Sequence, residues 1–176
     1  MPIRTLPAKL ILAVVSVICY GLISLLAETL DSYPGSPDSG LWIHHLIGIV
    51  FGALVMSSYV GSQQRIWRVI AMCIASAAIY YLAIHFVTDG PLGYDTILTF
   101  VASGSGAALL VGLAVSALAP RTFSRKLIPL TLVAGAAGGA MFEFKLALDE
   151  IMLVAHAAWQ LLVCLALHFS FRNAET

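Results

Sequence analysis

Apolar stretches of about twenty residues recur along the whole chain, and this pattern most limits the fold that the chain can adopt. A helix of about 20 apolar residues is long enough to cross the hydrocarbon core of a bilayer. Polar, proline-rich or glycine-rich residues separate the stretches. The stretches occupy residues 9–27, 42–60, 67–87, 95–118, 128–147 and 151–170. The sequence therefore predicts an all-α, polytopic integral membrane protein, a single domain built as a bundle of six transmembrane helices.

The composition excludes a water-soluble globule. Hydrophobic residues make up 60% of the chain and charged residues only 10%, whereas a soluble domain has about 25% charged residues. The net charge is zero and no basic run is present, so we expect the lipid bilayer, and no nucleic acid, as a partner. The three cysteines lie apart in apolar segments without a C-x-x-C pair, and we interpret them as small buried hydrophobes.

The basic residues predict the orientation of the helices, because lysine and arginine stay in cytoplasmic loops. With both termini in the cytoplasm, eight of the nine basic residues lie inside and only Lys145 lies outside. The eight are Arg4, Lys9, Arg65, Arg68, Arg121, Arg125, Lys126 and Arg172. We expect the first apolar stretch to act as a signal anchor. The sequence thus predicts a multi-pass protein of the cell membrane, of the bacterial inner membrane, with its N- and C-termini inside.

Most carboxylates gather at the opposite, outer ends of the predicted helices. Glu143 differs from the loop acids because it falls within the predicted helix 128–147. A carboxylate at membrane depth usually faces the bundle or a water-filled cavity. The remaining outer acids are Glu28, Asp31, Asp38, Asp89, Asp95, Asp149 and Glu150.

Four histidines share the outer side with these acids. His44 and His45 begin the second predicted helix, His85 ends the third, and His156 lies near the start of the sixth. Imidazole and carboxylate are ligands for a divalent metal ion such as zinc, and histidine also titrates near neutral pH. The leading hypothesis is an outward-facing site, formed by His44, His45, Glu143 and His156, that binds a metal ion or handles protons.

His156 also begins a polar stripe along the sixth predicted helix. Gln160, Cys164 and His168 follow it at successive spacings of four residues, which place side chains on one helix face. Unpaired polar groups in hydrocarbon are costly. We therefore expect His156 to face the bundle interior, with a polar partner from the second, fourth or fifth helix.

Small residues predict the faces where helices meet. Gly48 and Gly52, and again Gly135 and Gly139, are four residues apart, and residues 102–108 are all glycine, alanine or serine. Such surfaces let helix backbones approach closely. Their partner is another helix of this chain, a second copy, or a different membrane subunit. A second hypothesis is therefore a non-catalytic structural or accessory subunit of a membrane complex.

Ser103 or Ser105 with His156 gives a third hypothesis, in which the imidazole takes a proton from the serine hydroxyl. The pieces Ser105-Gly106, Ala155-His156 and His44 or His45 resemble the rhomboid intramembrane proteases. This resemblance implies a six-helix intramembrane serine hydrolase, with Ser105 or Ser103 as nucleophile and His156 as base. The chain differs from that family at Ser103, Gly48 and the pair Trp159-Gln160.

Two cofactor readings also involve His156. His156-Ala-Ala-Trp-Gln160 is similar to the His-x-x-Trp-His ending of ceramidase and progestin-receptor type membrane hydrolases, which implies zinc; Gln160 stands where that family has its second histidine. The other reading is a haem held by His45 or His85 on one helix and His156 on a facing helix.

Overall fold

The computed structural model describes residues 5–31, 40–59, 66–89, 96–119, 124–142 and 152–172. These residues form six α-helices and contain no strand, which confirms the predicted all-α fold. The helices are α1 (Leu6–Asp31), α2 (Gly40–Leu54), α3 (Ile66–Asp89), α4 (Ile97–Leu118), α5 (Leu127–Ala140) and α6 (Met152–Arg172). A short 3₁₀ helix, η1 (Met56–Tyr59), follows α2.

Two helices are less regular than the sequence predicts. The predicted helix 42–60 begins as α2 and finishes as η1, where the Val55 carbonyl accepts bonds from both the amide and the hydroxyl of Ser58. The predicted helix 128–147 ends earlier, because α5 stops at Ala140 and Met141 and Phe142 form a turn. Residues 143–147, Glu143 among them, lie outside the described residues.

Four of the helices are long and apolar enough to cross a membrane, namely Leu6–Leu26, Ile66–Thr88, Ile97–Leu118 and Val154–Phe171. Two shorter apolar helices are His45–Tyr59 and Leu127–Ala140. Large apolar side chains lie on the outside of the bundle, such as Ile11, Ile74 and Val133, the last 68% exposed. An apolar exterior of this kind is typical of a surface that faces lipid. The helices thus indicate a membrane protein.

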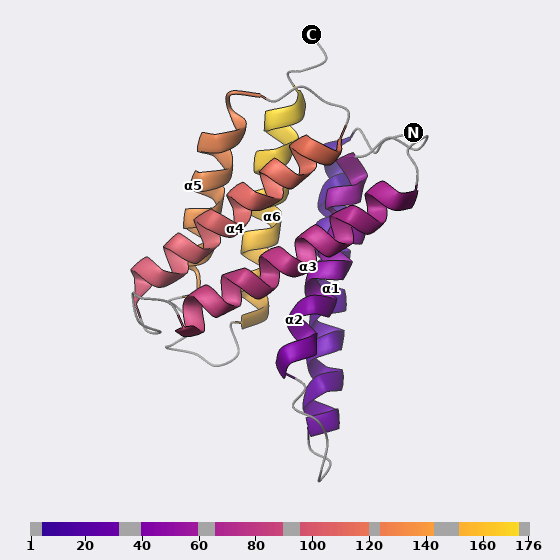
Figure 1. The fold of residues 1–176 in the computed structure, drawn as a ribbon, viewed down its shortest axis with the longest axis vertical. Helices are drawn as coiled ribbons and strands as arrows, with labels where there is room; N and C mark the ends of the chain where they lie inside the picture. The colour runs from indigo at the N-terminus through magenta and orange to yellow at the C-terminus, as the bar shows by residue number, and fades with distance from the viewer. Residues whose placement is uncertain are drawn as a thin grey trace.

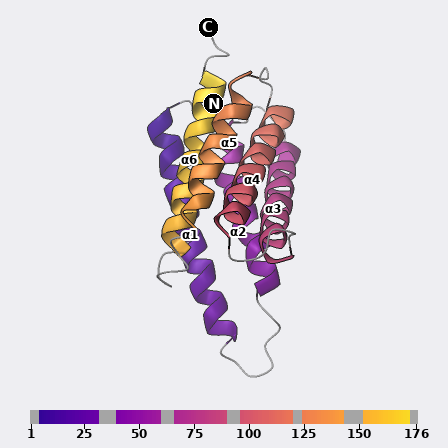
Figure 2. The same ribbon diagram turned by 90° about the vertical axis from the view of Figure 1, so that its left-hand side faces the viewer.

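The helices form a closed ring. Each helix packs against the next one in the chain, and α6 packs against α1 to close the ring. Figures 1 and 2 show that α1 begins and α6 ends at the same end of the bundle. The pairing of α6 with α1 brings the polar stripe of α6 against the first helix.

Glycines hold the ring together at two helix pairs. A Cβ added at Gly48 would lie 2.5 Å from Ala77 Cα, and one at Gly52 would lie 2.6 Å from the Met72 carbonyl oxygen, so α2 touches the α3 backbone. On α5, a Cβ at Gly139 would collide with the Phe100 carbonyl of α4. These predicted contact faces are confirmed, and their partners are helices of the same chain.

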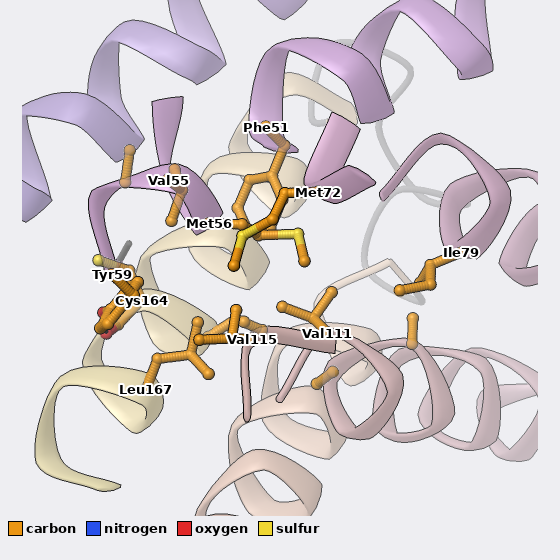
Figure 3. Packing of buried hydrophobic residues seen from close by; sticks show 14 of the residues in the cluster. Phe51, Val55, Met56, Tyr59, Met72, Ile79, Val111, Val115, Cys164 and Leu167 are labelled. Carbon is orange, nitrogen blue, oxygen red and sulfur yellow. The ribbon is translucent and has the colours of Figure 1, made fainter. Parts of the chain in front are cut away.

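Apolar side chains fill the middle of the ring. Phe51, Met56 and Met72 from the α2–α3 side meet Val111 and Val115 of α4, and all five are completely buried (Figure 3). The middle of the ring is therefore a close-packed apolar core. The buried polar groups of α1 and α6 lie beside this core.

Candidate functional site

His156 faces into the bundle between α1 and the turn after α5. Its ring stacks on Tyr20 of α1, with centroids 4.3 Å apart and planes 20° apart. The edge of Phe142 meets the same imidazole at 4.8 Å. The neighbouring hydroxyl group therefore belongs to α1, a helix that sequence reasoning did not place at the site.

The Tyr20–His156 stack fixes the register of two antiparallel helices. Because both helices rise by about 1.5 Å per residue, Ser16 lies opposite Gln160 one turn further along. Ser16 is ten residues from the start of α1 and Gln160 is twelve from the end of α6, so both lie roughly 15–18 Å from the same end of the bundle. Polar residues of α1 and α6 thus occupy similar levels along the contact between the two helices.

Gln160 is anchored from the opposite side by α3. Its side chain is completely buried, and its Nε2 donates a hydrogen bond to the Tyr80 hydroxyl at 3.1 Å. The Tyr80 ring packs edge-on against Trp159 at 5.7 Å and against Phe51 at 6.0 Å. The two ring contacts fix the position of the Tyr80 phenol, and the hydrogen bond to its hydroxyl fixes the Gln160 amide.

Three buried oxygen atoms near this level have no hydrogen-bond partner among the residues that the structure describes. They are Ser16 Oγ, Ser76 Oγ and Gln160 Oε1. Ser16 is one turn from Tyr20, Ser76 is one turn from Tyr80, and Gln160 is the residue that donates to Tyr80. Polar atoms of this kind in proteins are commonly satisfied by internal water.

A lysine lies near the end of the same helix contact where α1 begins and α6 ends. Lys9 is only 2% exposed, and its Nζ lies 3.8 Å from the centroid of the Tyr59 ring. The Tyr59 hydroxyl donates to the Cys164 carbonyl oxygen at 3.0 Å, and Figure 3 shows Tyr59 beside Cys164. A cation over an aromatic face is favourable, more so where water is excluded.

We call this chain of groups the polar file. Its members come from α1 and α6, with one tyrosine each from η1 and α3. They are Lys9, Ser16, Tyr20, Tyr59, Tyr80, His156, Gln160, Cys164 and His168. Three groups of contacts lie along it: Tyr20 with His156, Tyr80 with Gln160, and Lys9 with Tyr59, whose hydroxyl donates to the Cys164 carbonyl.

The other predicted ligands are placed differently. His45 stacks on Tyr81 of α3 at 5.1 Å, and His85 meets the same ring edge-on at 4.2 Å, on the outer surface of the α2–α3 pair. The side chain of His44 and the whole of Glu143 lie outside the described residues. Within the described part of the chain, no three histidine, cysteine or acidic side chains come together in a way that could hold a metal ion.

The two candidate nucleophiles join α4 to its neighbours. Ser103 Oγ donates to the Ala83 carbonyl of α3 at 2.8 Å, and Ser105 Oγ donates to the Leu132 carbonyl of α5 at 3.4 Å. Between them, the Gly104 carbonyl accepts a hydrogen bond from Trp159 of α6 at 3.2 Å. In this arrangement both serine hydroxyls donate to main-chain oxygens of a neighbouring helix. Small polar residues commonly make such hydrogen bonds where membrane helices pack together.

Sequence reasoning found the α6 half of the polar file and missed the α1 half. The signal was present, because Lys9, Ser16 and Tyr20 are separated by seven and four residues and so share one helix face. Lys9 was counted only as a basic residue of the cytoplasmic side. Tyr59 and Tyr80 carry no comparable signal, since isolated tyrosines in apolar helices are common at membrane interfaces.

The chain matches no family model, no curated protein and no solved structure. The chemistry of the polar file is therefore the basis for a function. Imidazole, phenol and ammonium groups can exchange protons, and hydroxyl and amide groups can hold a water by hydrogen bonds.

Proposed function

We propose that this protein moves protons across a membrane along the polar file. The observation that carries the proposal is the pair Ser16 and Gln160, whose Oγ and Oε1 atoms are buried at about the same level of adjacent helices without a hydrogen-bond partner among the described residues. A water between them would donate one hydrogen to each oxygen. Such a water would link the histidine above to the phenol and lysine below.

His156 is the outer proton-exchanging group in this scheme. Its half-buried ring lies at the outer end of the file, and histidine is the side chain whose ordinary pKa lies near physiological pH. Ionisable groups inside transmembrane bundles commonly belong to proton relays. The imidazole takes a proton from the outer side and gives it to the water at Ser16 and Gln160.

Gln160 positions that water. Because Nε2 donates to Tyr80, the buried Oε1 is the acceptor of this amide that remains for a water. The phenol of Tyr80 is in turn fixed by Trp159 and Phe51. A rigid acceptor keeps the donor–acceptor distance short along a relay, which proton transfer requires.

The proposal includes insertion of all six helices with both termini in the cytoplasm, in the bacterial inner membrane. Three features support it. The number of helices is even, α1 begins at the end of the bundle where α6 ends (Figure 2), and eight of nine basic residues belong to segments of that side. Under this orientation His156 lies nearer the outside and Lys9 nearer the cytoplasm.

Proton flux into proteoliposomes tests the proposal. The purified protein is reconstituted with an internal pH dye, and a potassium gradient with valinomycin drives protons inward. We expect flux well above that of empty vesicles, a loss of most of it in His156→Gln, and normal flux in His45→Gln, because His45 stacks on Tyr81 outside the polar file. Flux equal to that of empty vesicles overturns the proposal and favours an accessory subunit.

A further inference from the structure

Lys9 is the one charged member of the polar file, and it lies where the file reaches the inner end of the bundle. We infer that Lys9 is the selectivity group of this path and excludes metal cations while protons pass. The inference rests on the proposed function and adds a property that proton movement alone does not require.

The burial of Lys9 is the first observation. Lysine is almost never fully buried, and near a helix end it normally extends its ammonium group to water. Here the side chain is 2% exposed although Lys9 stands in the first turn of α1. The ammonium group therefore lies inside the helix bundle and not in the surrounding solvent.

The fixed position of the ammonium group is the second observation. Nζ lies over the ring of Tyr59, and that ring is held by a hydrogen bond to the Cys164 carbonyl and by Phe171, whose ring centroid is 5.8 Å away. His168 is buried one turn beyond Cys164 on the same face of α6. Elements η1 and α6 thus hold the cation beside the stripe that the file follows.

A fixed positive charge acts differently on protons and on metal ions. A sodium or potassium ion must pass as an ion, and the repulsion from an ammonium group is strong where water is scarce. A proton moves by exchange between groups, so the ammonium group releases one proton and the neutral amine that remains takes up the next excess proton that arrives along the file, which restores the ammonium group. The same positive charge therefore repels metal cations and takes part in the movement of protons.

Charge-retaining and charge-removing variants in the proteoliposome assay test the inference. Proton flux is read with the internal dye, and potassium uptake is measured separately without valinomycin. We expect the unmodified protein to take up no potassium beyond empty vesicles, Lys9→Gln to raise uptake at least tenfold, and Lys9→Arg to leave it at the baseline. Lys126→Gln is the matched control, since Lys126 is an exposed lysine of the same end of the bundle.

The outcomes separate this inference from the proposed function. Unchanged potassium uptake in a folded Lys9→Gln protein that still moves protons overturns the role of Lys9 and leaves the proton path standing. Potassium uptake by the unmodified protein overturns it as well, and that measurement needs no variant to fold. Absence of proton flux in the unmodified protein overturns the proposed function itself.

Discussion

Trp159 donates its indole Nε1 hydrogen to the main-chain carbonyl of Gly104, 3.2 Å away, and so joins α6 to α4 at a buried point. The same tryptophan lies against α5, where a Cβ added at Gly138 would come within 2.7 Å of Trp159 Cα. Trp159 directly precedes Gln160, so the contacts that orient the tryptophan also set the direction of the neighbouring amide. The polar file thus depends on packing outside it.

Replacing this tryptophan by phenylalanine tests the hydrogen bond without removing the ring. We expect Trp159→Phe to lower the free energy of unfolding by about 0.5–1.5 kcal/mol, the net contribution of one such bond. Thermal unfolding of the purified protein in detergent measures the change. Trp67→Phe is the control, because Trp67 is 48% exposed on α3. Equal stability losses in the two variants would contradict a role for the Gly104 bond.

Substitutions at two glycines can distinguish a close contact between helices from a position on the open surface of the bundle. Gly139 meets the α4 backbone at Phe100, whereas a Cβ at Gly106 would meet nothing within 4 Å. We expect Gly139→Leu to destabilise the protein by about 1–3 kcal/mol through overpacking. Gly106→Leu should stay close to the unmodified protein. Thermal unfolding of both variants measures these changes in stability. A Gly139→Leu protein as stable as the unmodified one would show that α4 and α5 can move apart at little cost in free energy.

The sequence predicts the helices well because their signal is local. Each helix corresponds to an apolar stretch of its own. The Gly48–Gly52 and Gly135–Gly139 spacings predict the contact faces of two helices, even though the spacing does not identify the partner helix. The early end of α5 at Ala140 is not visible in this way, because residues on both sides of it are apolar or small. Termination there depends on the turn at Met141 and Phe142.

The polar file is harder to predict, because it depends on register between distant helices. The stripe from His156 to His168 follows from spacing within one helix. Its partners do not: Tyr80 and Gln160 are 80 residues apart, and Tyr59 and Cys164 are 105 residues apart. Which tyrosine meets which position is decided by the packing of the ring of helices.

Labelling of single cysteines tests the orientation of the helices. In a protein whose three native cysteines are replaced by alanine, we expect Ser36→Cys to react with a membrane-impermeant maleimide added to intact cells. Ser62→Cys should react only after the membrane is made permeable, since the loop with Arg65 is predicted inside. The reverse pattern would invert the direction of proton movement in the proposal, with Lys9 nearer the outside.

A double-mutant cycle at Tyr80 and Gln160 separates the stability of the polar file from its activity. Tyr80→Phe leaves the Gln160 amide without its acceptor, and Gln160→Leu leaves the Tyr80 hydroxyl without its donor. Each single change should cost about 1–3 kcal/mol, because a buried polar group is left unpaired. In the double variant both partners are apolar, and we expect its stability to recover most of that loss.

Proton flux should follow a different pattern in the same four proteins. Gln160→Leu removes the buried Oε1 acceptor that the proposal assigns to the water, so we expect flux to fall to the level of empty vesicles in this variant and to stay there in the double variant. Tyr80→Phe keeps Oε1 but frees the amide to rotate, and flux should fall only partly. Because the double variant regains stability, its lost flux cannot be ascribed to unfolding. Restored flux in that variant would mean that protons do not pass by Gln160.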